Sequence, residues 1–211
     1  MSVVRDFFGS AAIDSEAHGV DVGTGTNLYP ALAMLPFCAR LDLVEFSAAN
    51  VGWLRRQMAG YDEHWDDFWR VYSECEAYAR IVAPRTEFHR KVEVRRGSVF
   101  RLPSRTWDVG TMFFVACSLS TDKAEFRRAI DCFAHSLRPD APFATAFMAD
   151  SKGYFVADRW FPAVSIHVDD VAESLAPVAY DVDIRLIDIG DPLRDGYSGM
   201  IVATGRVDGQ R

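Results

Sequence analysis

The chain has 211 residues, 49% of them hydrophobic, and a formal net charge of −7 at pH 7. This length and apolar content suffice for one large core, so we expect a single domain over residues 1–211. An acidic chain lacks the basic face that phosphate contacts require, which argues against a nucleic-acid partner. No uncharged apolar stretch reaches the length of a membrane span and residues 1–12 carry no secretion signal, so we expect a cytoplasmic protein with no membrane partner.

The first predicted strand, Val20–Val22, leads into a turn with two closely spaced glycines, Gly23 and Gly25. Glycine adopts backbone angles that other residues avoid and leaves no side chain to block a ligand, so such a turn lets a nucleotide-like molecule approach the main chain. A helix over 30–35 follows and begins with proline, a favoured first-turn residue. Strand, glycine turn and helix stand in the order of a nucleotide-binding site, although many α/β domains use such a turn only for tight packing.

The second predicted strand, Leu41–Phe46, carries Glu45 about twenty residues past the turn, where an acid can hold ribose hydroxyls. Ser47 then reads as a helix N-cap, with Asn50 in the first turn behind it. Asp21 precedes the first glycine and is expected at the pocket mouth, where its carboxylate would repel a pyrophosphate but suit an ammonium and a sulfonium. Leu28 stands where a dinucleotide fingerprint has its third glycine. These two residues favour S-adenosylmethionine (SAM) over a dinucleotide.

A helical insert is predicted at about 61–90, with an aromatic stripe on one helical face that favours packing over a ligand cage. The remaining strands are expected at 92–95, 109–115, 143–148, 182–187 and 200–204, and the clearest helix at 121–137. The alternation of strands and helices predicts an α/β, Rossmann-like, doubly wound sheet of about seven strands, mostly parallel. Residues 191–196 read as the loop of an antiparallel C-terminal hairpin, because no helix separates the last two strands.

Ligands in such sheets bind beyond the carboxyl ends of the strands. This rule adds Gly97, Ser98 and Val99 after the third strand, and Ala116 and Cys117 after the fourth. Cys117 is placed near the acceptor, but as a structural thiol rather than a nucleophile, since no histidine accompanies it in the sequence. The dispersed cysteines and histidines predict no metal site.

Residues 150–154 follow the fifth strand and form the candidate acceptor loop. Asp150 and Tyr154 are the preferred acceptor contacts, with Ser151 between them, and Asp150 would orient a cationic or hydrogen-bonding acceptor. An ordinary surface turn is an equally weighted alternative, because aspartate, serine and glycine are turn formers.

Three segments carry a resemblance to a known family: Asp21-Val22-Gly23-Thr24-Gly25-Thr26-Asn27-Leu28-Tyr29, Val44-Glu45-Phe46-Ser47-Ala48-Ala49-Asn50 and Leu137-Arg138-Pro139. They resemble class I SAM-dependent methyltransferases, and more narrowly the family of nicotinamide and phenylethanolamine N-methyltransferases, in its actinobacterial branch. The resemblance covers about residues 21–205. It implies that the insert helps to cover the site. One departure is Gly97-Ser98-Val99, where the family often has an aspartate before the valine.

The resemblance also implies residue roles. The glycine turn and Tyr29 would contact the methionine end of SAM, Glu45 would hold the ribose, and Phe46 and Asn50 would lie near the adenosine. Together with the strand-end residues, the predicted cofactor contacts are Asp21, Gly23, Thr24, Gly25, Thr26, Asn27, Tyr29, Glu45, Phe46, Asn50, Gly97, Ser98, Val99 and Ala116.

The expected reaction is methyl transfer from SAM to a small-molecule acceptor by in-line displacement, with S-adenosylhomocysteine (SAH) as product. By resemblance, an amine or heteroaromatic nitrogen is preferred over oxygen. Alignment and exclusion of water supply most of the catalysis, so no obligatory catalytic side chain is named. The main alternative is a non-catalytic SAM-binding domain that acts as a sensor or partner subunit, and a dinucleotide oxidoreductase ranks below it. Only about twenty residues precede the glycine turn, so a neighbouring subunit, as in a homodimer, is one way to complete the site.

Overall fold

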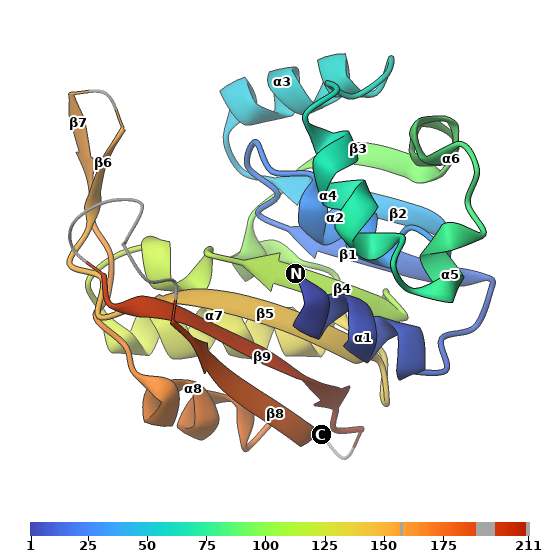
Figure 1. Cartoon of the computed structure of the whole chain (residues 1–211). Coiled ribbons are helices and arrows are strands. Elements are labelled where there is room, and N and C mark those ends of the chain that lie inside the picture. The colour runs from blue at the N-terminus through green and yellow to red at the C-terminus, as the bar shows by residue number, and fades with distance from the viewer. Residues whose placement is uncertain (157, 189–196, 210–211) are drawn as a thin grey trace.

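Seven strands form one mixed sheet with helices on both faces in the computed structural model, which describes residues 1–156, 158–188 and 197–209 (Figure 1). The strand order is β3-β2-β1-β4-β5-β9-β8. Five strands run parallel, and β9 pairs antiparallel with both β5 and β8. The predicted doubly wound sheet with an antiparallel C-terminal pair is therefore confirmed. The expected hairpin loop, 191–196, lies outside the described residues.

The strands of the main sheet agree with the predicted ones to within a few residues. Their bounds are β1 Ala17–Val22, β2 Cys38–Glu45, β3 Val92–Arg96, β4 Val109–Phe113, β5 Pro142–Ala149, β8 Ala179–Ile187 and β9 Gly199–Val207. Strand β4 ends two residues early, since it was expected to continue to Val115. Phe114 instead has a φ of 60° and its N–H donates to Ala146 O at 2.7 Å, so the chain leaves the strand there and turns into η2, Ala116–Ser118.

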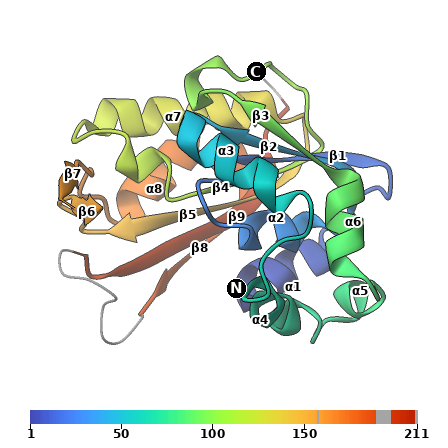
Figure 2. The same cartoon turned by 90° about the horizontal axis from the view of Figure 1, so that it is seen from above.

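Helices cover the two faces in separate groups, as the view from above shows (Figure 2). One face carries α1 Ser2–Ser10, α2 Tyr29–Met34 and α4 Trp65–Tyr72, whose buried side chains share one core cluster with β1 and β2. The other face carries α7 Lys123–Ser136 and α8 Val168–Leu175. The remaining helices are α3 Ala48–Gln57, α5 Glu76–Ala79, α6 Pro84–Lys91 and the short η1 Val99–Arg101.

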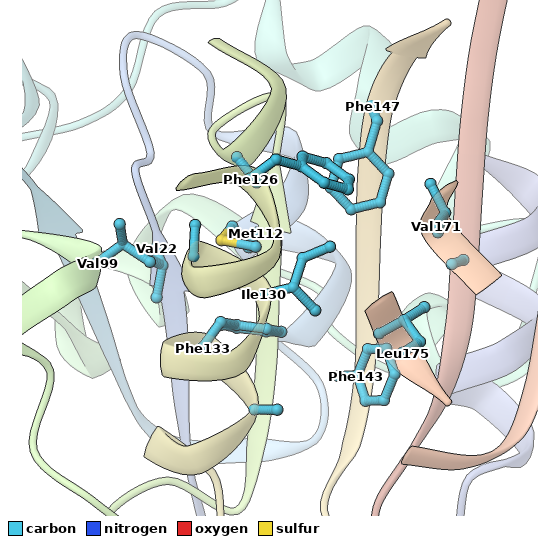
Figure 3. Packing of buried hydrophobic residues seen from close by; sticks show 14 of the residues in the cluster. Val22, Val99, Met112, Phe126, Ile130, Phe133, Phe143, Phe147, Val171 and Leu175 are labelled. Carbon is cyan, nitrogen blue, oxygen red and sulfur yellow. The ribbon is translucent and has the colours of Figure 1, made fainter. Parts of the chain in front are cut away.

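The amphipathic helix α7 shows how the sequence builds the second core. Asp122 caps it by accepting a hydrogen bond from Ala124 N at 2.8 Å, as an N-cap aspartate does. Phe126, Ile130 and Phe133 recur at helical spacing, are all buried, and point into the sheet (Figure 3). The predicted helix over 121–137 is thus confirmed, apart from its ends.

The insert between β2 and β3 packs as the sequence analysis favoured. Trp65, Trp69 and Tyr72 are buried in the core that α4 shares with α2. The Tyr72 hydroxyl donates to Tyr29 O at 2.8 Å, so α4 is held directly to the residue that begins α2. The aromatic stripe is therefore a packing surface that fixes the helix after the glycine turn.

Residues 154–156 and 159–161 form two short strands that the sequence analysis did not predict. Strands β6, Tyr154–Val156, and β7, Arg159–Phe161, pair antiparallel and project beyond the carboxyl edge of the main sheet (Figure 1).

All four cysteines are free thiols, with Cys38 and Cys117 buried. Among the described residues, no helix has both the length and the apolar character needed to cross a membrane.

The packing of α7 yields a stability prediction. Phe133→Ala removes a ring that is 1% exposed and should lower the free energy of unfolding by about 3–5 kcal/mol, because it leaves a cavity against β5. Arg127→Ala on the exposed side of the same helix is the control, with an expected change within about 0.5 kcal/mol. Urea unfolding measures both, and equal effects of the two substitutions would contradict the packing.

Candidate functional site

The two glycines of the turn after β1 serve different purposes. Both have a left-handed backbone, with φ of 70° at Gly23 and 61° at Gly25, which favours glycine. A Cβ on Gly23 would lie only 2.2 Å from a methyl group of Val115, so Gly23 is required for packing. A Cβ on Gly25 would meet nothing closer than 3.9 Å. The packing interpretation of the turn therefore holds for Gly23, whereas the space around Gly25 is compatible with the nucleotide-binding interpretation, which stays a prediction.

A single carboxylate joins the glycine turn to the next helix. Glu45, at the end of β2, accepts hydrogen bonds from Gly25 N at 2.8 Å through Oε2 and from Ser47 N at 2.7 Å through Oε1. Asn50 Nδ2 lies 3.3 Å from the same Oε1. A carboxylate offers about four acceptor positions, so one remains for a ligand hydroxyl. The start of α3 is also capped as predicted, because Ser47 Oγ accepts from Asn50 N.

Asp21 lies deeper than the sequence analysis expected. Its side chain is 1% exposed, between β1 and β4, rather than at the mouth of a pocket. Oδ1 accepts a hydrogen bond from Thr111 Oγ1 at 2.7 Å, whereas Oδ2 is buried without a partner. Burial raises the pKa of Asp21 to about 7, the bonds from Thr111 and Thr24 oppose this, and the nearby charge of Glu45 adds to it. A buried oxygen without a partner is costly, so a ligand that brings an N–H donor or a positive charge would fit beside it.

Aromatic rings lie next to Asp21. The Tyr29 ring stacks on Phe68 of the insert at a centroid distance of 5.5 Å, and Phe113 at the end of β4 lies 5.9 Å away. Burial, and then the charge of Asp21, raise the pKa of the Tyr29 hydroxyl, which therefore stays protonated at neutral pH. Ring faces attract cations, so this wall and the Asp21 carboxyl together favour a positively charged group.

The other predicted cofactor contacts divide into open and buried positions. Thr26, Asn27 and Phe46 are exposed around the glycine turn and the end of β2. Gly97 is held beside them, because its N–H donates to Glu45 O at 3.0 Å. The other predicted contacts of this group lie buried or half-buried beneath these exposed residues. They are Thr24, Ser98, Val99 and Ala116. The carboxyl ends of β1, β2, β3 and β4 thus bring most of these residues to one edge of the sheet (Figure 1).

The acceptor residues are not gathered as predicted. Cys117 is fully buried in the core under α7, so its side chain does not face the open edge. It is a structural thiol, as the sequence analysis favoured, but its predicted place near the acceptor is wrong. Ser151 is 2% exposed, and its hydroxyl accepts from Gly153 N at 3.5 Å within the turn. Tyr154 stacks on Phe161 across the β6–β7 hairpin. Of the predicted acceptor residues, Asp150 keeps a partly exposed carboxylate at the sheet edge.

Two residues beside Asp150 were missed by the sequence analysis. Ser198 Oγ donates to Asp150 Oδ2 at 2.5 Å, and His167 Nδ1 lies 3.0 Å from Asp150 Oδ1. The available signal was weak, because His167 reads only as a residue before the acidic start of a helix. Within the described part of the chain, no group of three or more His, Cys, Asp or Glu residues is arranged to hold a metal ion.

The buried carboxyl of Asp21 predicts a pH dependence of stability. Because its pKa of about 7 in the folded chain exceeds the ordinary value of about 3.9, the folded state holds a proton that the unfolded state releases, and stability falls as pH rises between these values. Asp21→Asn removes this loss, so its free energy of unfolding relative to wild type should rise by on the order of 4 kcal/mol across that range. Urea unfolding at a series of pH values tests this, with Glu16→Gln on an exposed loop as control. A difference that does not change with pH would contradict the raised pKa.

Comparisons with known proteins add to this geometry at the level of the fold. No family model matches the sequence, and no curated protein matches it. A SAM-dependent methyltransferase from Methanosarcina mazei is similar in structure, with a TM-score of 0.63, 10% sequence identity, and an alignment covering 99% of this chain and 97% of that chain. NodS N-methyltransferase from Bradyrhizobium japonicum, in complex with SAH, has a TM-score of 0.59 and 13% identity over 98% of this chain and 84% of its own.

A larger protein from Bordetella parapertussis is also similar, with a TM-score of 0.61 and 13% identity. The alignment covers 98% of this chain, which spans 66% of that protein. The chain therefore has the Rossmann-like α/β fold of class I SAM-dependent methyltransferases.

Proposed function

We propose that the protein transfers a methyl group from SAM to a small-molecule acceptor, with an amine or heteroaromatic nitrogen preferred. The observation that carries the proposal is the pair of carboxylates around Gly25: Glu45 anchored to the turn, and Asp21 with an unpartnered oxygen beside it. The shared fold supports the same activity. The preference for nitrogen, and a place near the nicotinamide and phenylethanolamine N-methyltransferases, rest on the motif resemblance.

Each part of the site has a role in holding the donor. Glu45 accepts from one ribose hydroxyl, the exposed ring of Phe46 lies against the adenine, and Gly25 lets the ligand approach the main chain. Asp21 meets the ammonium group, and the wall formed by Tyr29 and Phe113 faces the sulfonium. The residues present thus fit a ligand with a sugar at one end and two positive charges at the other.

The proposed reaction needs little direct chemical participation by the side chains. Bound SAM supplies an activated methyl group, whose C–S electron pair stays on sulfur as the acceptor lone pair forms the new bond. The chain's contribution is to align the acceptor and exclude water, and such positioning can supply about 7–11 kcal/mol of the barrier. A neutral nitrogen attacks through its lone pair and becomes cationic, whereas an acceptor that binds as an ammonium ion first releases a proton to solvent. A carboxylate at the sheet edge, such as Asp150, stabilises the charge that forms on nitrogen.

Donor binding is the first test of the proposal. Glu45→Gln keeps the size of the side chain but sets an amide NH2 against one of two backbone N–H donors, so SAH affinity should fall at least about tenfold. Isothermal titration calorimetry measures this. Glu93→Gln is the control, since Glu93 is an exposed carboxylate that binds Arg40 on the neighbouring strand β2 and Arg95 on its own strand.

The outcomes of that titration are distinct. Equal SAH affinities of Glu45→Gln and wild type would remove Glu45 from the donor site. Failure of the wild-type chain to bind SAM and SAH at all would overturn the proposed function. A rise in melting temperature with NAD but not with SAM would instead support an oxidoreductase.

Single-turnover kinetics test the transfer step. With protein in excess over methyl-labelled SAM, label should pass to small amines faster than to phenols of similar size, because the carboxylates of this edge stabilise a cationic product. Chromatography of the labelled product measures both rates. Tight donor binding without transfer to any amine or phenol would favour the sensor or partner-subunit alternative.

A further inference from the structure

A cavity of about 190 Å³ lies at the carboxyl end of β5, between the start of α8, the end of β8 and the start of β9. Asp150, His167 and Ser198 form its polar wall, and Val168, Leu186 and Ile201 its apolar wall. An engineered protein cavity of roughly 150 Å³ holds benzene, so this cavity is large enough for a group of that size. None of the glycine-turn residues lines it.

The carboxylate of Asp150 is fixed at the wall of this cavity. Its backbone N–H donates to Ile166 O at 3.1 Å, and Ser198 N donates to Ala149 O at 3.0 Å, which ties β5, β9 and the segment before α8 together. On the side chain, Ser198 Oγ donates to Oδ2 at 2.5 Å and His167 Nδ1 lies 3.0 Å from Oδ1. Asp150 also has a φ of 58°, a left-handed conformation that aspartate tolerates better than most residues. Three elements therefore hold one partly exposed carboxylate in a single orientation.

The charges around the cavity favour a cation. Asp169 also lines it, while Asp170 is paired with Lys123 at 2.7 Å, so that lysine is already bound. The start of a helix favours anions, but Asp169 and Asp170 occupy the first turn of α8 and offset its positive end. A carboxylate that already accepts two polar contacts still has lone pairs for a further donor. An ammonium group thus finds a charge-assisted acceptor next to apolar side chains.

We propose that this cavity binds a small protonated amine with an apolar body, its ammonium group on Asp150 and its body against Leu186 and Val168. Leu186 is 58% exposed, so the body of the ligand would cover apolar surface that now faces solvent.

The cavity lies on the same edge of the sheet as the glycine turn. β5 is two strands from β1, or about 10 Å at the usual strand spacing. Val164 N donates to Cys117 O at 3.0 Å, which links the segment before α8 to the end of β4. That the bound amine is the methyl acceptor rests on the proposed function, whereas its binding does not.

Nuclear magnetic resonance of the uniformly 15N-labelled full chain tests the site without any donor. Benzylammonium is the probe, benzyl alcohol its neutral analogue of the same shape, and benzoate its anionic analogue. Benzylammonium should shift the amide resonances of Asp150, His167 and Ser198 and bind at least about tenfold more tightly than benzyl alcohol, while benzoate leaves these resonances unchanged.

Asp150→Asn should reduce benzylammonium affinity to that of benzyl alcohol. Asp140→Asn is a matched control, because Asp140 is also left-handed, with a φ of 65°, and its carboxylate accepts a hydrogen bond from the Tyr180 hydroxyl at 2.9 Å. The control should bind benzylammonium as wild type does.

Three results would overturn the site: no shift of these resonances, equal affinity for the ammonium and the alcohol, or wild-type affinity in Asp150→Asn with its spectrum otherwise unchanged. Calorimetry with SAH on the same samples reports the donor site separately. Loss of amine binding with intact SAH binding would therefore contradict this inference alone, and the reverse would contradict the proposed function alone.

Discussion

The carboxylate of Glu45 is the contact on which the rest of the site depends. It accepts from the N–H groups of Gly25 and Ser47, so one side chain fixes both the glycine turn after β1 and the start of α3 after β2. Those N–H groups are donors that a turn and a helix start cannot satisfy internally, and a buried carboxylate is the strongest acceptor available to them. The same bonds hold the carboxylate at the carboxyl edge of the sheet with one acceptor position left over. Under the proposed function, folding and binding therefore use one group.

Asp21, in contrast to Glu45, destabilises the fold. It lies one strand away with an oxygen that has no partner, and burial raises its pKa to about 7. A chain selected only for stability would place an apolar or fully bonded side chain there, because a half-satisfied buried carboxyl is destabilising. Asp21 is 1% exposed and lies near Tyr29, whose ring packs on Phe68 and Phe113, so a cation is the natural complement to its carboxyl. The buried carboxyl of Asp21 lowers the stability of the fold, and a cationic ligand bound beside it would restore that stability.

The insert supports one end of the carboxyl edge of the sheet, and the antiparallel strands with α8 support the other end. On one side, α4 packs its aromatic residues on α2, with Tyr72 bonded to Tyr29, and so supports the wall next to Asp21. On the other side, β9 and α8 bring Ser198 and His167 to Asp150. The glycine-turn end of the edge is built on packed aromatic side chains, whereas the far end holds an open cavity with a charged wall. This arrangement suits a donor of constant structure and an acceptor chosen by local chemistry.

The sequence by itself determined the order of the main strands along the chain, the glycine turn, the acid after β2, the cap at Ser47 and the helix α7, because each depends on local backbone preference or on hydrophobic spacing. It also predicted that the insert's aromatic stripe is a packing surface. Tertiary structure decided what distance in space controls: the depth of Asp21, the burial of Cys117, the early end of β4 at Phe114, and the β6–β7 hairpin. Above all, it brought His167 and Ser198 to Asp150, since residues from three separate elements meet only when β9 pairs antiparallel with β5 and α8 returns to the same edge. No local pattern encodes that meeting.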